Sequence, residues 1–129
     1  MRRALLASAF AVAAWPAQAT GEIACGGKGV SIDLLVGRLD VLSIARAVIE
    51  IGGTTWSSTP DSWPGKAITV GQGFADDRVL AVDFTDENVD EVIGQLRVFK
   101  GAEGESRAAG GVFTFKGHGA FVVDCSDIQ

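Results

Sequence analysis

The chain has 129 residues, of which 47% are apolar, and it carries a formal net charge of −5 with a single histidine. This acidic balance argues against a nucleic-acid partner and against a polybasic surface for anionic lipids. The length suits one globular domain that builds its own core.

The first nineteen residues have the pattern of a cleaved signal peptide. Met1-Arg2-Arg3 is a basic start, an uncharged apolar run follows, and Ala17-Gln18-Ala19 is the small-residue pattern that precedes a cleavage site. The run is shorter than the ~20 apolar residues that span a bilayer. We therefore expect residues 1–19 to be removed, with residues 20–129 left as a single β domain; a retained buried helix is the alternative.

No lipid or membrane anchor is expected after cleavage. Cys25 lies near the cleavage site, but the charged Glu22 three positions upstream does not suit a lipoprotein signal. Removing the two leader arginines leaves nine basic residues against sixteen acidic residues, a net charge of −7. The sequence thus predicts a periplasmic or secreted product whose charge steers it toward basic partners.

The chain has two cysteines, Cys25 and Cys125, one near each end of the predicted mature protein. Exported proteins mature where thiols oxidise, so we predict one disulfide that joins the first and last strands. Two free thiols and a metal pair are the alternatives. A metal site needs three or four ligands and His118 is the single histidine, so we expect neither a metal nor another cofactor.

The fold is predicted to be mainly all-β. Valine, isoleucine, phenylalanine and threonine occur in short runs separated by glycine-containing turns, which is typical of a small antiparallel β-sandwich or barrel. The expected strands lie at about 22–25, 30–36, 44–51, 54–58, 67–73, 78–84, 95–101, 111–116 and 119–125.

Gly52-Gly53 predicts a two-residue hairpin turn, because both positions take positive φ without steric cost. A turn there pairs Ile51 with Thr54. The same register places Trp56 opposite Ile49 on one face of the hairpin. We interpret Trp56 as a core residue rather than a platform for a ligand.

A second hairpin is predicted to turn through Gly117-His118. The expected register puts one set of side chains on one face (Val112, Thr114, Phe121, Val123, Cys125) and another set on the other (Phe113, Phe115, Ala120, Val122). Both faces are apolar, which is unusual for a strand pair with one side in water. Either a second layer covers the Phe113/Phe115 face, or that face binds a partner.

One short helix is predicted over residues 86–93 to supply that cover. Thr85-Asp86 offers an N-cap, and acidic residues follow where the helix dipole favours them. Apolar residues recur at helical spacing, and Gly94 ends the helix. We expect its apolar stripe to pack on a sheet face.

We find no recognisable catalytic apparatus in the sequence. Glycines flank His118, which is typical of an exposed turn residue, and no serine lies in a Gly-x-Ser-x-Gly elbow. The acidic residues between Asp83 and Glu91 lack the spacing of a calcium loop, and the predicted helix start explains them. Paired carboxylates for glycoside cleavage depend on the fold and stay open.

The most distinctive loop runs over residues 54–65. Two prolines stiffen it, hydroxyl side chains including Ser62 line it, and Trp63 precedes a proline, which favours an extended shape. An aromatic side chain on a stiff polar loop suits stacking on a sugar or filling a pocket of a partner. The alternative is that Trp63 seals one end of the barrel.

The small size, the predicted export and the terminal cysteines, together with Lys116-Gly117-His118-Gly119-Ala120, resemble the periplasmic inhibitors of c-type lysozyme. The resemblance implies an exported protein that binds a basic enzyme. The chain has no tyrosine and lacks the Ser-Gly-x-x-x-x-Tyr type motif of that family. We therefore assign it to no family.

The sequence as a whole predicts an exported, noncatalytic binding or envelope-associated protein. The alternatives are a lysozyme-inhibitor-like protein and a small hydrolase with an unrecognised site. The expected partner is a basic protein or a glycan, and a monomer is expected. The candidate binding residues are Trp63, Ser62, Phe113, Phe115 and His118.

We predict that the mature protein begins at Thr20 and carries a bond between Cys25 and Cys125. The intact mass of the exported protein, measured before and after reduction and alkylation, tests both statements. A count of two free thiols in the oxidised sample would refute the bond, and a mass that includes the leader would refute the cleavage.

Overall fold

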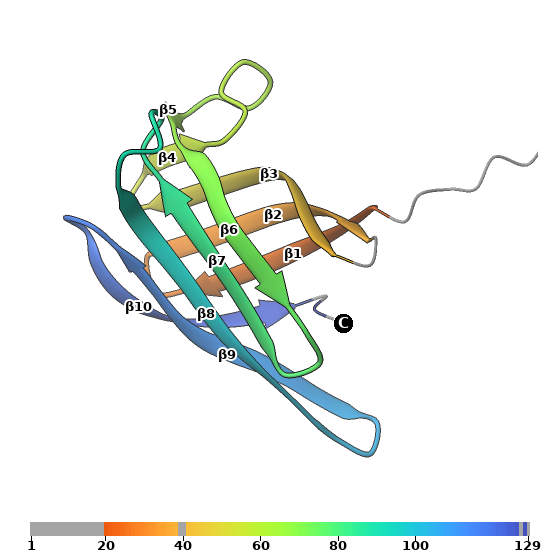
Figure 1. Ribbon diagram of the computed structural model, residues 1–129. Helices are drawn as coiled ribbons and strands as arrows, with labels where there is room; N and C mark the ends of the chain where they lie inside the picture. The colour runs from red at the N-terminus through yellow and green to blue at the C-terminus, as the bar shows by residue number, and fades with distance from the viewer. Residues whose placement is uncertain (1–19, 39–40, 127, 129) are drawn as a thin grey trace, which may run out of the picture.

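The computed structural model describes residues 20–38, 41–126 and 128, which form a ten-stranded sheet that curls into a nearly closed barrel (Figure 1). The predicted all-β fold is thus confirmed, while the predicted signal peptide lies outside the described residues. The strands are β1 (Thr20–Gly27), β2 (Val30–Arg38), β3 (Leu42–Ile51), β4 (Thr54–Ser57), β5 (Lys66–Ala67), β6 (Thr69–Ala75), β7 (Val79–Thr85), β8 (Val92–Glu103), β9 (Ser106–Phe115) and β10 (Gly119–Ser126).

The strand order in the sheet is β5-β4-β3-β2-β1-β10-β9-β8-β7-β6. The chain therefore starts in the middle of the sheet, runs outward by hairpins to β4, continues through a loop to the short parallel edge strand β5, and crosses to the other edge at β6. From β6 it returns by hairpins to β10, which pairs with β1. All neighbouring strands are antiparallel except β4 and β5.

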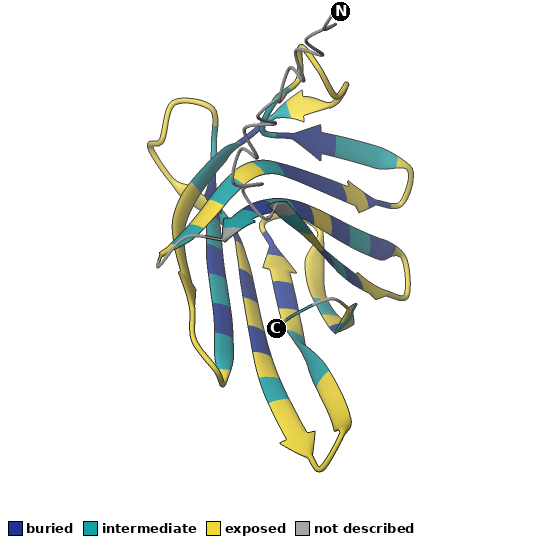
Figure 2. Ribbon diagram, turned by 90° about the vertical axis from the view of Figure 1, so that its right-hand side faces the viewer, coloured by how far each residue is buried: buried dark blue, intermediate teal, exposed yellow. Residues whose placement is uncertain are grey.

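Alternating burial along the strands places the core inside the barrel. In β2, every second side chain from Val30 to Val36 is buried, as expected when one face of a strand lies in the core. Figure 2 shows the same alternation as bands of buried and exposed residues along several strands. The largest fully buried apolar side chains are Phe84, Phe113, Ile32, Leu34, Ile49, Leu80 and Leu96.

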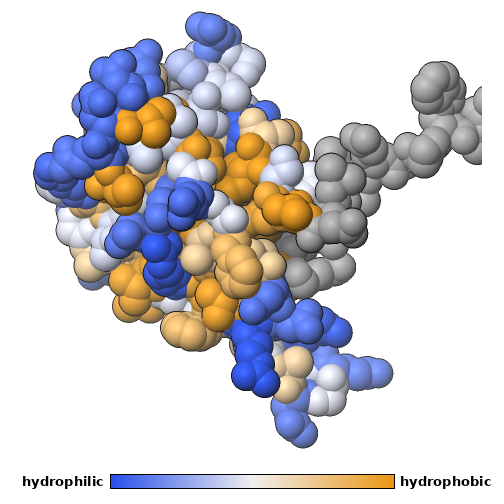
Figure 3. All heavy atoms as spheres, in the orientation of Figure 1, coloured by the Kyte–Doolittle hydropathy of each residue, from blue (hydrophilic) through white to orange (hydrophobic). Residues whose placement is uncertain are grey.

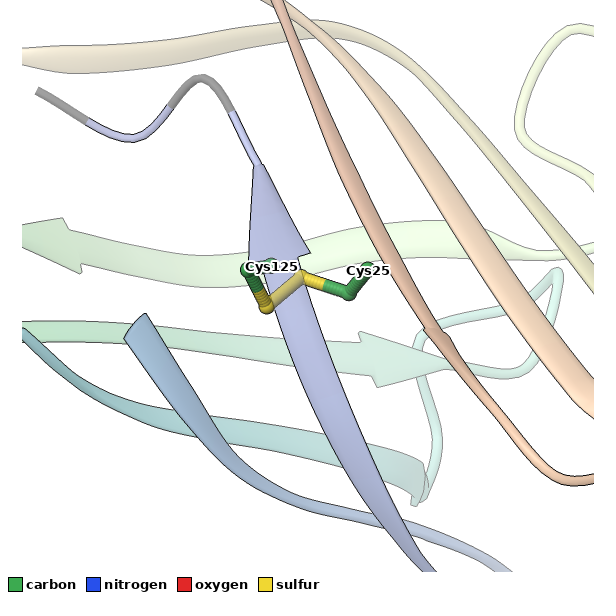
Figure 4. The surroundings of a disulfide bond; sticks show 2 residues. All are labelled: Cys25 and Cys125. Atoms are coloured by element: carbon green, nitrogen blue, oxygen red, sulfur yellow. A yellow bond between two sulfur atoms is a disulfide. The ribbon is translucent and has the colours of Figure 1, made fainter. Parts of the chain in front are cut away.

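The predicted disulfide is confirmed and joins the first and last strands. Cys25 and Cys125 are direct partners in the β1–β10 register, with a Cα–Cα distance of 4.0 Å. Figure 4 shows the bond bridging the two strands. The cross-link spans 100 residues of sequence and holds the middle of the sheet together.

The first hairpin agrees with the sequence prediction. Ile51 pairs with Thr54 and Ile49 pairs with Trp56, around a turn in which Gly52 and Gly53 have φ values of 55° and 85°. Trp56 is 6% exposed and belongs to the core. The interpretation of this side chain as a core residue is therefore confirmed.

The predicted helix over residues 86–93 is wrong. The described residues contain strands and turns without a helix, and hence no helix long and apolar enough to cross a membrane. Residues 86–91 form a β7–β8 turn in which the Asp86 carboxylate accepts the Asp90 N–H at 2.7 Å. Asp86 thus accepts a backbone N–H as an N-cap residue would, but it does so in a turn. A helix cannot continue here, because Val92 already pairs with Thr85 in the sheet.

The register predicted for the last hairpin is also wrong, by one residue. Phe115 pairs with Gly119 across a three-residue turn, so that Phe113 lies opposite Phe121. Both glycines of the segment, Gly117 and Gly119, adopt positive φ, which lets the turn take this length. Phe113, Phe115, Phe121, Val123 and Cys125 consequently share the inner face, and Val112, Thr114, Ala120 and Val122 share the outer face.

The β6–β7 turn is fixed by the side chain of Asp76. Its Oδ1 accepts the backbone N–H groups of Arg78 and Val79, each at 2.8 Å. These two hydrogen bonds hold the pKa of the Asp76 carboxyl below its usual range. The Asp76 N–H in turn donates to the Val79 carbonyl at 3.0 Å, which sets the register of β6 against β7.

We predict that the double variant Cys25→Ala/Cys125→Ala loses about 4 to 5 kcal/mol of unfolding free energy, because loop closure over ~100 residues restricts the unfolded chain by that amount in the entropy model. Urea unfolding of the variant and of the reduced and oxidised natural protein measures the loss. The reduced natural protein serves as the control for the loss of the two sulfur atoms from the core. Equal midpoints for all three samples would contradict the structural role of the bond.

Candidate functional site

The outer face of β6 to β10 carries an exposed apolar row across five strands. The cross-strand register aligns one residue from each strand, in the order Phe74, Ala81, Arg97, Val112 and Val122. Three of the apolar members are well exposed, at 57% for Phe74, 44% for Val112 and 77% for Val122. Cross-strand neighbours of this kind contact one another, so they form one continuous surface.

A second row lies beside the first on the same face. Val79, Phe99, Gly110 and Asp124 follow one another across β7 to β10. The ring of Phe99 is 69% exposed. We call the exposed apolar side chains of the two rows, Phe74, Phe99, Val112 and Val122, the outer patch.

The charge at the centre of the outer patch is neutralised. Arg97 Nη2 lies 2.7 Å from Asp83 Oδ1, and Arg97 Nη1 donates to the Leu96 carbonyl at 2.9 Å. The guanidinium therefore sits flat on the sheet between two apolar flanks. Beside it is a shallow groove of ≈ 320 Å³, lined by Gln72, Gly73, Phe74, Ala81, Asp83 and Arg97.

The outer patch is of the size of the largest apolar patch on a typical monomer. Its four side chains present roughly 400 Å² of apolar surface, from the full areas of such side chains and their exposed fractions. The largest patch on a typical monomer is about 300 to 600 Å² and is often functional. Figure 3 shows apolar side chains, in orange, gathered on the face that carries β6 to β9, with hydrophilic side chains among them.

The structure places Trp63 at the surface, 47% exposed. Its backbone N–H donates to the Thr59 carbonyl at 2.8 Å, and the Arg46 guanidinium carbon lies 4.6 Å from the centre of the indole ring. Ser62 lies in the same turn, where its hydroxyl donates to the Thr59 carbonyl at 3.3 Å. A tryptophan in this position does not close the barrel.

The loop that holds Trp63 is anchored to the sheet by buried serines. Ser57 is fully buried, and its Oγ accepts the Thr59 N–H at 3.1 Å. Ser58 Oγ accepts the Ala47 N–H at 2.8 Å. Trp63 is thus presented on a fixed turn, stacked on Arg46.

His118 packs as an aromatic side chain. Its ring centre lies 4.9 Å from that of Trp56 and 5.4 Å from that of Phe115, edge-on in both cases. Within residues 20–38, 41–126 and 128, its side chain has no hydrogen bond to a serine or a carboxylate. His118 is exposed in the β9–β10 turn, as the flanking glycines predicted, and its ring lies against the core residues Trp56 and Phe115 at one end of the barrel.

The predicted binding residues do not form one site. Phe113 and Phe115 are buried inside the barrel, so their face is covered, as one of the two sequence-based alternatives predicted; the cover is the opposite side of the sheet, where Trp56 packs on Phe115, and not the predicted helix. Trp63 and Ser62 lie on the β4–β5 loop, and His118 lies in the β9–β10 turn. A binding role for these three remains a prediction.

Sequence reasoning missed the outer patch. A signal for it was present in two pairs of consecutive apolar residues, Val98-Phe99 and Val112-Phe113. In a strand, neighbouring side chains point to opposite faces, so one residue of each pair must leave the core. The one-residue register error assigned the wrong member of the second pair to the surface.

A larger groove of ≈ 660 Å³ opens beside the end of the β8–β9 hairpin. Small side chains line much of it, with Cys125, Ile128 and the basic residues Lys100 and Arg107. Lys100 Nζ donates to the Asp76 carbonyl at 2.8 Å, so this amine serves to tie β8 to the β6–β7 turn.

Comparison with known proteins assigns no role to these surfaces, since no protein-family model, curated protein or solved structure matches the chain. Across the part of the chain that the structure describes, no group of three or more histidine, cysteine, aspartate or glutamate side chains is placed to hold a metal ion. The candidate site therefore rests on the chemistry of the outer patch.

We predict that Trp63→Ala lowers the unfolding free energy by about 1 kcal/mol or less, the size of an exposed cation–π contact. Trp56→Ala is the matched control, because it removes the same ring from the core and should cost about 3 to 5 kcal/mol. Urea unfolding of both variants measures the difference. Equal losses would show that Trp63 belongs to the core.

Proposed function

We propose that the chain is an exported, noncatalytic binding protein that holds a partner protein on the outer face of β6 to β10. The observation that carries the proposal is the outer patch itself, an exposed apolar surface built around a neutralised arginine. Apolar and aromatic side chains with an arginine at the centre are typical of the cores of protein–protein interfaces.

The shape of the surface favours a protein over a small molecule. Small ligands bind in concave pockets that bury most of their area, whereas the outer patch lies on the outer, convex face of the curled sheet. The roughly 400 Å² that it offers is about half of the ~800 Å² that each partner buries in a standard interface. Polar residues around the patch would supply the remaining interface area.

Charge favours a basic partner. The full chain has a net charge of −5, and the predicted mature chain has −7. Asp124 lies at the end of the second row, directly across from the backbone of Gly110. An acidic surface raises the association rate with basic proteins, an effect that salt weakens.

Export is supported by the leader pattern and by the disulfide, because such bonds persist in oxidising compartments. The periplasm and the extracellular medium both meet this condition.

We predict that a photo-crosslinking residue at position 99 captures one protein reproducibly in the producing cell, because Phe99 is the most exposed ring of the outer patch. The matched control is the same residue at position 41, since Val41 is 73% exposed but lies outside β6 to β10. Mass spectrometry identifies the captured protein. The same capture from both positions, or none from position 99, would contradict the proposal.

A c-type lysozyme is the concrete basic partner that the sequence resemblance suggests. The purified protein should inhibit it at low salt, and Phe99→Ser/Val122→Ser should weaken the inhibition about tenfold or more, because central apolar residues dominate interfaces. Val41→Ser should leave the inhibition unchanged. Absence of inhibition at micromolar excess would remove lysozyme as the partner while leaving the crosslinking test in force.

A further inference from the structure

The strand β6 is an open edge of the sheet. It is the last strand in the sheet order, and among the described strands it pairs with β7 alone. Residues 71–75 are all exposed. The strand sequence, Thr-Val-Gly-Gln-Gly-Phe-Ala, contains neither a charge nor a proline, two of the features that protect natural edge strands. A bulge between Val70 and Gly73 leaves residues 73–75 in regular pairing with β7.

The direction of the backbone groups in β6 follows from the turn that ends it. The Asp76 N–H donates to the Val79 carbonyl, so these two residues form a hydrogen-bonded pair of the antiparallel ladder. Such pairs alternate along a strand, and the register continues through Phe74 opposite Ala81. The N–H and C=O groups of Gly73 and Ala75 therefore point away from β7, toward the open edge.

The core beneath this edge is already covered by side chains of β3. A Cβ atom built on Gly73 would lie 3.3 Å from Leu42 Cδ2 and 3.5 Å from Ile44 Cδ1. Side chains of β3 thus pack beneath the glycine, without a strand ladder between β3 and β6 in the described part of the sheet. Another strand can therefore add on the solvent side without uncovering the core.

Acidic residues flank both ends of β6. At its start, the Thr69 hydroxyl donates to the Glu87 carbonyl at 3.4 Å, which places the β7–β8 turn beside the strand. That turn carries four carboxylates, of which Glu91 is paired with Lys116. At the other end, Asp76 and Asp77 follow directly in sequence, but Arg78 and Lys100 lie beside Asp76, so the acidic end is the one at the β7–β8 turn.

We propose that the β6 edge binds an extended segment of a basic polypeptide, which adds to the sheet as a further strand. Backbone groups of Gly73 and Ala75 would supply the hydrogen bonds, as in other cases of strand addition. The carboxylates of the β7–β8 turn would attract the basic segment. Phe74 belongs to the outer patch, so a single partner can cover both surfaces. In this respect the inference rests on the proposed binding function.

Charge disfavours a second copy of the chain as the occupant. Each copy carries a formal net charge of −5, so two copies repel one another, and like charges in an interface cost affinity. A basic segment carries the opposite charge.

The test uses a fluorescein-labelled peptide with lysines at both ends and alternating valine and threonine between them, long enough to match β6. Fluorescence anisotropy at low salt should show saturable binding to the natural protein. The Ala75→Pro variant should bind about tenfold more weakly, because proline removes one N–H that points to the edge. The matched control Ala75→Gly retains that N–H and should bind as the natural protein does.

Two further peptides separate the contributions of backbone and charge. A peptide N-methylated at alternate residues should lose binding about tenfold or more, because it cannot complete the ladder. A peptide with glutamates in place of the lysines should also bind more weakly. Equal binding of the methylated and unmethylated peptides, or equal loss in Ala75→Pro and Ala75→Gly, would overturn the inference.

Separate experiments test strand addition at β6 and partner binding at the outer patch. The peptide is too narrow to reach Phe99 or Val122, so its binding depends on the β6 edge alone, whereas crosslinking from position 99 tests the outer patch. Thermal unfolding of Ala75→Pro checks that the variant is folded. A dimer that dissociates in Ala75→Pro, seen by sedimentation, would instead identify a second copy as the occupant and overturn the inference.

Discussion

The pairing of β1 with β10 is the constraint on which the rest of the structure depends. These strands come from opposite ends of the described chain, yet they lie in the middle of the sheet and are bonded through Cys25 and Cys125. One half of the barrel is built outward from β1 and the other outward from β10. Without this central contact, two separate sheets would each expose their inner face.

The edge strand β6 packs against β3, and the described residues form no ladder between these two strands. Side chains of Leu42 and Ile44 fill the space beneath Gly73, so the seam is closed by apolar packing alone. This arrangement leaves β6 with free backbone groups on a barrel whose core is nevertheless covered. The proposed strand addition and the outer patch are neighbours for that reason, since Phe74 is part of both.

Local chemistry decided which parts of this fold were predictable from the sequence. The Gly52-Gly53 turn allows one length only, and it correctly placed Trp56 in the core. Gly117 and Gly119 allow more than one turn length, so the register of the last hairpin was not determined by the sequence nearby. Asp86 makes the same side-chain hydrogen bond in a turn as at a helix start, and only the pairing of β7 with β8 distinguishes the two. The outer patch escaped prediction because its residues alternate with core residues of the same apolar character.

The central position of β10 also has a consequence for the order of events in folding. Strands β1 to β9 can form local hairpins while β10 is absent, but the contact across 100 residues must wait for it. Such non-local contacts slow folding, because the loop must close before the contact contributes. A nascent chain therefore stays incomplete, with its inner face accessible, until the last of its ten strands is free.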